Sequence, residues 1–145
     1  MTQEKTIITA EVQPVNGLTL AGRSSSNHWV IMDGKKQVGG NEGGSTPMEL
    51  VLMAVGGCTG MDVVSILKKM RVEYKDLKIS LEADKADEHP KVFTDIRIVY
   101  HLWGKDIPLE KVEKAVSLSM EKYCSVSAMI KESVGLSYSV EIHEE

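Results

Sequence analysis

Short apolar stretches alternate with turn residues over the first third of the chain. Three such stretches cover residues 6–12, 17–21 and 28–32, with Pro, Asn, Asp and Gly between or after them. Apolar stretches bounded by these residue types are typical of strands joined by turns. The pattern predicts a small antiparallel meander.

A glycine-rich segment follows over residues 35–45. It holds four glycines and shows no apolar periodicity, which favours a mobile loop ahead of the next element. Loops of this kind often carry functional residues.

The pattern changes to that of a helix at Thr46. Thr46 is a suitable N-cap, Pro47 suits the first helical position, and Glu49 at the third position completes a capping box. From there to about Met70, apolar residues cover most of the circumference. A helix that is apolar all round belongs inside a core or an interface. We therefore expect a homodimer, because one thin sheet cannot cover this helix on every side.

A hairpin is expected after the long helix. Apolar and polar residues alternate over residues 77–83 and again over residues 96–102, on either side of an acidic turn at residues 84–90. A period of two residues is that of a strand with one buried face. The second alternation places Ile96, Ile98, Tyr100 and Leu102 on one face.

The remaining chain predicts two helices and a closing strand. Pro108 opens a helix whose apolar residues form a single stripe as far as Tyr123, and residues 124–134 favour a short further helix. Residues 136–142 alternate as a strand. The order of elements predicts one α+β domain over residues 1–145 with an antiparallel sheet.

Composition narrows the classes of partner. The chain has 145 residues and a formal net charge of −4, with acidic and basic residues interspersed. There is no basic stripe for a nucleic-acid backbone. The N-terminus lacks an apolar leader, and the longest nearly apolar stretch, residues 50–55, is too short to span a bilayer. The sequence predicts a cytoplasmic protein with neither nucleic acid nor membrane as partner.

Metal and cofactor sites are not expected from residue spacing. The two cysteines lie 66 positions apart and the four histidines are scattered, which matches no zinc spacing and no disulfide framework. The sequence therefore predicts no structural metal and no bound cofactor.

Cys58 lies in an unusual setting for a helix. Three glycines within five residues surround it, in Gly56-Gly57-Cys58-Thr59-Gly60, and each costs about 1 kcal/mol relative to alanine in a helix. Glycine allows a backbone, a helix or a ligand to approach closely, so the cluster indicates close contact around the thiol. Two interpretations stay open: a reactive thiol, or a small buried hydrophobic residue at a tight packing point.

Cys124 lies at the junction between the second helix and the short one. By itself it would be interpreted as a core cysteine. However, two cysteines that each lie at a helical irregularity are what a nucleophilic thiol and a resolving thiol would need.

These motifs resemble the OsmC/Ohr superfamily (osmotically inducible protein C and organic hydroperoxide resistance). The similar residues are Thr46-Pro47-Met48-Glu49-Leu50 with Gly56-Gly57-Cys58, followed by Tyr123-Cys124-Ser125-Val126-Ser127. The continuation over residues 62–67 resembles the YhfA-like branch of that superfamily. The resemblance extends from about Gly17 to the end of the chain and includes Met32-Asp33-Gly34.

The resemblance implies a fold and an activity. The fold is an intertwined homodimer with the long helices at its centre and the sheets wrapped around them. The activity is that of a peroxidase: Cys58 attacks an organic hydroperoxide, and Cys124 resolves the sulfenic acid as a disulfide. A thiol or dithiol reductant such as dihydrolipoyl groups then reduces the disulfide.

Two departures from the family pattern bear on the site. The residue after the motif proline is usually glutamate, whereas here Met48 stands there and Glu49 follows; a shift of one residue rotates a helical side chain by about 100°. Glu49 lies about 13 Å from Cys58 along the helix axis, so the two cannot touch on one helix. Glu49 is therefore either a catalytic residue or only part of the capping box. The second motif is usually Cys-Pro-Tyr-Ser, of which Cys124 and Ser127 match.

A reactive thiol needs a nearby cation that favours the thiolate. The chain has three arginines, Arg23, Arg71 and Arg97. Arg23, at the end of the second predicted strand, is in the region where the family places its active-site arginine, although an ordinary solvated strand end is the alternative. Asp62, one turn after Cys58, would disfavour the thiolate unless it has a partner or faces away.

Two functions follow. The first is a thiol-dependent peroxidase for organic hydroperoxides, in which Met53, Met61 and Met129 would form apolar walls. The second is a non-enzymatic module of the same fold, either a thiol redox sensor or a binder of small apolar ligands.

Overall fold

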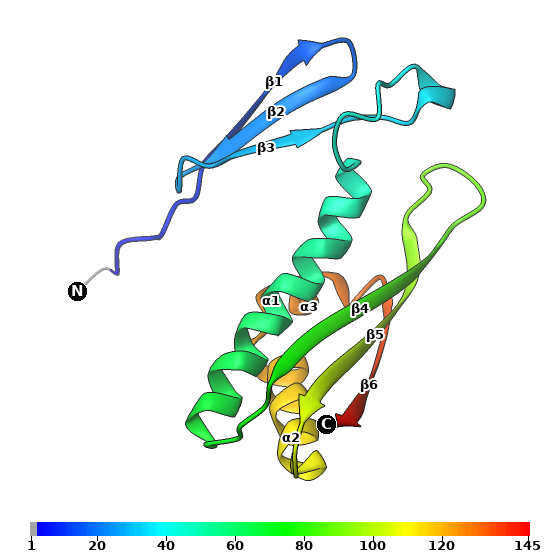
Figure 1. The fold of residues 1–145 in the computed structure, drawn as a ribbon. Helices are drawn as coiled ribbons and strands as arrows, with labels where there is room; N and C mark the ends of the chain where they lie inside the picture. Colours follow the sequence, from blue (N-terminus) through cyan, green and yellow to red (C-terminus); the bar gives the residue numbers. More distant parts are fainter. Residues whose placement is uncertain (1–2) are drawn as a thin grey trace. The chain divides into compact units, whose positions relative to one another are not determined.

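A computed structural model describes residues 3–145 of the chain (Figure 1). The chain divides into two compact units, one ending at Val51 and one from Leu52 to Glu145. The elements in chain order are β1 (Ala10–Asn16), β2 (Thr19–Ser24), β3 (Trp29–Met32), η1 (Lys36–Val38), α1 (Pro47–Lys69), β4 (Asp76–Lys85), β5 (Phe93–Gly104), α2 (Leu109–Leu118), η2 (Ser119–Tyr123), α3 (Ser125–Ile130) and β6 (Gly135–Glu144). The prediction of a single domain stays a prediction.

The first unit contains the predicted meander. Strands β1, β2 and β3 pair in that order and are antiparallel, which confirms the prediction from the alternating stretches. The first strand begins at Ala10 rather than at residue 6 and includes Pro14. Proline is tolerated in an edge strand such as β1, because its missing N–H can lie on the side where the sheet has no partner strand.

The glycine-rich segment folds around the carboxylate of Asp33. Asp33 is buried and accepts hydrogen bonds from the Thr19 hydroxyl at 2.7 Å and from the backbone N–H groups of Gly34, Asn41 and Gly43 at 2.7, 3.1 and 3.1 Å. The Thr19 hydrogen bond, together with the three backbone N–H groups, lowers the pKa of Asp33 to about 2. The segment is therefore held at one point by a charge-assisted network.

Helix α1 begins where the capping signals predicted. The Thr46 N–H donates to Glu49 Oε2 at 2.6 Å, and the Glu49 N–H donates to Thr46 Oγ1 at 3.3 Å. One 18-residue window of α1 has a mean hydropathy of 1.9. By length and composition alone, α1 is long and apolar enough to span a membrane. Core helices of soluble proteins pass the same test. In α1, 28% of the window is buried, and Val55, Val63 and Leu67 are fully buried.

The second unit packs α1 and α2 against one face of the sheet β4-β5-β6 (Figure 1). The predicted hairpin is confirmed, since β4 and β5 are antiparallel. The predicted face of β5 is confirmed as well, because Ile96, Ile98, Tyr100 and Leu102 are all buried.

The sheet of the second unit is not wholly antiparallel, which corrects one part of the prediction. Strand β6 pairs with β5 in parallel, with Ile98 opposite Tyr138. The connection through α2, η2 and α3 is long enough for a crossover, so the chain returns to the start of β5 before β6 begins. Alternation along a strand shows which residues face the core but not the strand's direction.

Candidate redox site

The glycines around Cys58 allow the sheet to approach helix α1. A Cβ atom at Gly56 would lie 2.6 Å from Leu81 Cδ1, and one at Gly60 would lie 2.8 Å from Ile79 Cδ1, whereas Gly57 has no neighbour within 4 Å. Side chains of β4 thus occupy the space that two alanines would fill. The prediction of close contact beside Cys58 is confirmed, and the approaching element is the sheet.

Cys124 follows a π-helical turn that the sequence pattern did not predict. The predicted continuous helix changes at Ser119 into the π turn η2, and the Cys124 N–H donates to the Ser119 carbonyl at 2.7 Å. A π turn inserts one residue and redirects the chain, and such turns are frequent at functional sites. Cys124 then serves as the N-cap of α3, where its sulfur accepts from the Ser127 N–H.

The surroundings of the two sulfurs differ. Cys58 is half-buried, whereas Cys124 is 2% exposed, and both are free thiols. The Cys124 sulfur accepts hydrogen bonds from the Ser127 hydroxyl at 3.0 Å and from the Ser127 N–H at 3.4 Å. Burial raises the pKa of Cys124; the Ser127 donors oppose that effect, and the neighbouring Cys58 thiol adds to it.

Cys58 is among the groups that raise the pKa of Cys124, after burial. An effect of this kind acts only over a short distance, so it favours two cysteine segments that lie near each other. Sequence spacing could not indicate this proximity, because it depends on how α1 packs beside the π turn.

A buried chain of hydroxyl groups joins the two cysteine segments. Tyr100 OH lies 2.7 Å from Thr59 Oγ1, which lies 2.8 Å from Ser119 Oγ, and the Ser119 hydroxyl donates to Asp62 Oδ2 at 2.8 Å. Each hydroxyl has one proton and a carboxylate only accepts. Hence Tyr100 donates to Thr59, Thr59 to Ser119 and Ser119 to Asp62.

Ser119 connects the two cysteine segments. Its hydroxyl accepts a hydrogen bond from Thr59, the residue after Cys58, and its carbonyl accepts one from the Cys124 N–H. Of the two alternatives for Asp62, a partner or an outward orientation, the structure shows a partner, the Ser119 hydroxyl. Burial raises the pKa of Tyr100 to about 12, so Tyr100 keeps its proton as a donor. Sequence reasoning had named Asp62 and had placed Tyr100 on the buried face of its strand, but it missed Thr59 and Ser119, whose only signal was a polar residue at a core position.

Comparison with known proteins shows the family of the chain. The family model described as OsmC-like protein matches residues 39–139, which include both cysteines and all four residues of the hydroxyl chain. The chain belongs to the OsmC-like protein family.

Relatives of this OsmC-like chain include proteins that match nearly its whole length. Protein YhfA of Escherichia coli K12 is 41% identical over 133 residues, covering 92% of this chain and 96% of the relative. The crystal structure of a hypothetical protein from Aquifex aeolicus is 38% identical with a TM-score of 0.85, covering 97% and 99% of the two chains. An organic hydroperoxide resistance protein OsmC from Legionella pneumophila shares the fold, at 16% identity and a TM-score of 0.72, covering 96% and 99%.

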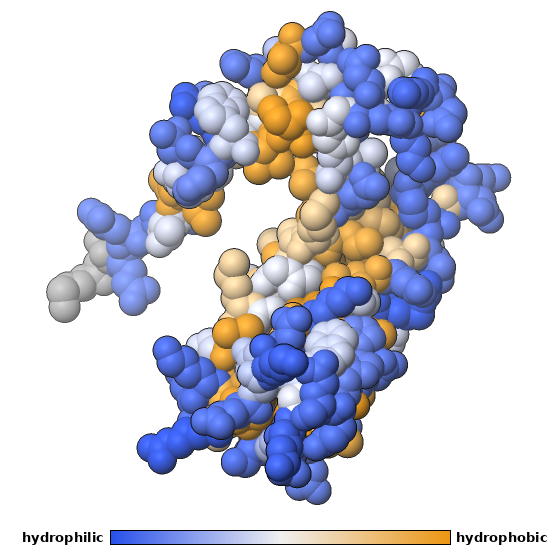
Figure 2. Space-filling view, viewed as in Figure 1, coloured by the Kyte–Doolittle hydropathy of each residue, from blue (hydrophilic) through white to orange (hydrophobic). Residues whose placement is uncertain are grey.

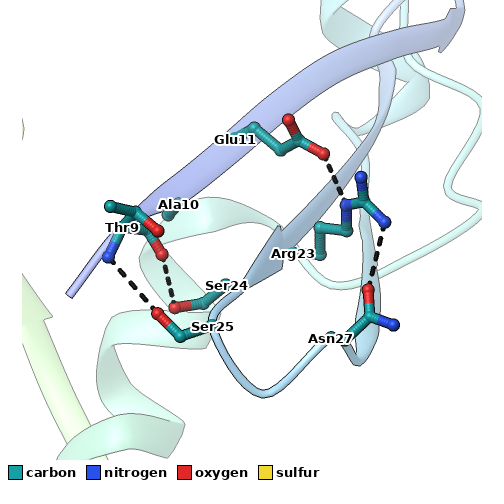
Figure 3. A pocket seen from close by; sticks show the side chains of 7 residues that line it. All are labelled: Thr9, Ala10, Glu11, Arg23, Ser24, Ser25 and Asn27. Atoms are coloured by element: carbon teal, nitrogen blue, oxygen red, sulfur yellow. Dashed lines mark hydrogen bonds and ion pairs between the residues drawn. The ribbon is translucent and has the colours of Figure 1, made fainter.

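Arg23, the predicted thiol activator, lies on β2 in the first unit of the OsmC-like chain. Its guanidinium forms an ion pair with Glu11, donates to Asn27 Oδ1 at 3.0 Å, and lies 4.8 Å from the ring centroid of Trp29. The contacts of Arg23 with Glu11 and Asn27 border a pocket of the first unit (Figure 3). Arg97, in the second unit, is paired with Asp84. The role of Arg23 toward Cys58 stays a prediction.

Glu49 forms the capping box of α1, as one of its two interpretations required. The backbone N–H of Thr46 is the main cause that lowers the pKa of Glu49, followed by the Thr46 hydroxyl. Its carboxylate is therefore engaged at the helix N-terminus. A catalytic role for Glu49 stays a prediction.

An apolar groove runs between α1 and β4 of the OsmC-like fold. It has a volume of about 660 Å³, and its lining consists mainly of glycine and apolar side chains: Gly56, Gly57, Gly60, Met61, Val64, Ser65, Lys68, Leu77 and Ile79. Figure 2 shows apolar surface along α1, where Met53, Met61 and Val64 are exposed.

Proposed function

We propose that this chain is a thiol-dependent peroxidase that reduces organic hydroperoxides, with Cys58 as nucleophile and Cys124 as resolving thiol. The observation that carries the proposal is that Thr59 and Ser119 join the segment of a half-buried Cys58 to the segment of a buried Cys124, whose sulfur accepts two hydrogen bonds from Ser127. An accessible thiol beside a protected one is the arrangement that attack followed by resolution needs.

The reaction proceeds in three steps. The Cys58 thiolate attacks the terminal peroxide oxygen, the O–O bond breaks, and the alkoxide takes a proton and leaves as an alcohol, so that Cys58 becomes a sulfenic acid. The Cys124 sulfur then attacks the Cys58 sulfur and releases water, which forms the disulfide. A dithiol reductant finally returns both cysteines to thiols and is itself oxidised to a disulfide.

Ser127 assists the resolving step. Burial keeps Cys124 protonated before the reaction, and the two Ser127 donors stabilise the negative charge that develops on its sulfur as it attacks. We expect Ser127→Ala to slow disulfide formation while leaving the first attack by Cys58 unchanged.

The relatives and the surface support an organic substrate. The Legionella protein of the same fold is named an organic hydroperoxide resistance protein. Met53, Met61 and Met129 are exposed apolar side chains that suit an apolar peroxide. In the proposed enzyme Arg23 is the cation that favours the Cys58 thiolate, and Glu49 keeps the start of α1 in place.

The enzyme is proposed to act as a homodimer in the cytoplasm. Val51, Met53, Met61 and Val64 leave a large apolar surface of α1 exposed, and a second copy of the chain would bury it. Sedimentation at micromolar concentration should give twice the chain mass of 16.0 kDa. A monodisperse species of single-chain mass would contradict the dimer.

Turnover distinguishes the peroxidase from the second candidate, a thiol sensor or binder of small apolar ligands, which the apolar groove favours. With cumene hydroperoxide and excess dihydrolipoamide, the wild type should consume many equivalents. Cys58→Ser should lose the fast reaction, whereas Cys124→Ser should consume one equivalent and accumulate sulfenic or sulfinic acid at Cys58. Stoichiometric oxidation without turnover, or equal behaviour of the two variants, would contradict the peroxidase.

A further inference from the structure

His101, Glu141 and His143 form a cluster on the second sheet, outside the redox site. In the pairing of β5 with β6, His101 lies opposite Glu141 and Trp103 lies opposite His143. His101 stands between Tyr100 and Leu102, both fully buried. Since successive residues of a strand face opposite sides, the cluster lies on the face turned away from α1 and α2.

The three potential ligand atoms converge on one point. His101 Nδ1 lies 3.1 Å from His143 Nε2 and 3.2 Å from Glu141 Oε2, and the last two atoms are 3.9 Å apart. A tetrahedral zinc ion with bonds of about 2.0–2.2 Å places its ligand atoms roughly 3.3–3.6 Å from one another. The triangle that the side chains form already has the size of one face of such a site.

Two neutral imidazoles cannot satisfy this triangle by hydrogen bonds among its three atoms alone. A neutral imidazole carries one N–H and the carboxylate carries none. If His143 Nε2 carries the proton and donates to His101 Nδ1, the lone pair of Nδ1 is used but Glu141 Oε2 receives no hydrogen. If His101 Nδ1 carries it, that one hydrogen must serve both neighbours at once. A cation between the three atoms would satisfy all of them together.

The side chains are also held in place by stacking. The Trp103 ring lies 4.7 Å from the His143 ring and 5.9 Å from the His101 ring, with interplanar angles of 17° and 25°. Stacking of this kind fixes the orientation of the imidazoles on an otherwise exposed sheet face. The two imidazoles therefore have little freedom left to lose when a ligand binds.

We propose that His101 Nδ1, His143 Nε2 and the Glu141 carboxylate bind one divalent transition-metal ion of the zinc class. Two imidazoles and one carboxylate match the ligand preferences of zinc. Glu141 is 54% exposed in its side chain, so the fourth position faces solvent. The ion would fasten the edge strand β6 to β5, and it requires neither cysteine. No sequence motif indicated the site, because the parallel pairing of β5 with β6 creates it.

Metal titration of the full chain tests the proposal. The protein should be free of tags and treated with EDTA before dialysis, because a histidine tag would itself bind metal. Calorimetry with Zn²⁺ should give one site per chain. His101→Ala and His143→Ala each remove a ligand atom, so each should lower the zinc affinity by more than about 100-fold. That value is the upper loss when only a residue that supports a ligand is removed. His28→Ala and His89→Ala serve as matched controls that should bind as the wild type does.

Two spectroscopic measurements separate this site from the cysteines. Co²⁺ bound to the wild type should show the spectrum of nitrogen and oxygen ligands without a thiolate charge-transfer band. In a Trp29→Phe background, Cu²⁺ should quench the fluorescence of Trp103, and His143→Gln should abolish that quenching while circular dichroism shows the fold intact. A thiolate band, unchanged binding in His101→Ala, or no binding of either ion by the wild type would overturn the proposal.

Discussion

Removal of the Ser119 hydroxyl probes how the two cysteine segments are joined. In Ser119→Ala, Thr59 loses the acceptor of its proton at 2.8 Å, and Asp62 loses a donor at 2.8 Å. Both Thr59 and Ser119 are fully buried, so water cannot replace the missing groups without opening the core. The backbone carbonyl of Ser119 remains, and with it the hydrogen bond to the Cys124 N–H.

The expected cost follows from the two lost hydrogen bonds. A neutral hydrogen bond contributes about 1 kcal/mol and one to a charged group about 1.5–3 kcal/mol. Ser119→Ala should therefore lower the free energy of unfolding by about 2.5–4 kcal/mol. Thr59→Val removes two neutral hydrogen bonds and should cost about 2 kcal/mol. Since the two residues share a bond, the double variant should cost less than the sum of the single ones.

Urea unfolding followed by circular dichroism measures these free energies, with Ser139→Ala at an exposed position of β6 as the control. The same variants should be tested for the rate at which hydroperoxide produces the Cys58–Cys124 disulfide, which we expect to fall in Ser119→Ala. A Ser119→Ala variant within about 0.5 kcal/mol of the control, the usual range of neutral surface changes, would refute the reasoning. So would strict additivity with Thr59→Val.

Three further predictions concern packing, acid stability and thiol activation. Gly56→Ala places a Cβ atom 2.6 Å from a β4 side chain and should lower the free energy of unfolding by about 1–3 kcal/mol, whereas Gly57→Ala, which enters open space, should gain up to about 1 kcal/mol; urea unfolding of both variants compares them. Asp33 has its pKa lowered from 3.8 to about 2, so its contribution to stability is complete above about pH 4 and is lost as the pH falls toward 2; acid unfolding should shift to higher pH in Asp33→Asn, and an unshifted curve would contradict the network. Arg23→Ala should slow the reaction of Cys58 with hydroperoxide in stopped flow, by roughly tenfold if a single ion contact is lost; an unchanged rate would assign the activation elsewhere.

Local signals were sufficient for most of the elements. The capping box at Thr46 and Glu49 predicted the start of α1 because an N-cap depends only on residues within one turn. The alternation that ends at Leu102 predicted both the β5 strand and its buried face, because the periodicity of a strand depends only on neighbouring residues. The π turn after Leu118 was not predicted, because its residues fit an ordinary helix pattern and packing decides where an extra residue is accommodated.

The sequence by itself determined the order of strands and helices, the glycine cluster beside Cys58 and the presence of two cysteines, since each of these is a property of neighbouring residues. Only the tertiary structure decided that β6 runs parallel to β5, that Ser119 joins the segments of Cys58 and Cys124, and that His101 meets His143. Apart from the bond between Ser119 and Cys124, these contacts join residues 40 or more positions apart. Their formation depends on the packing of the whole core, because no local preference of the chain favours one distant partner over another.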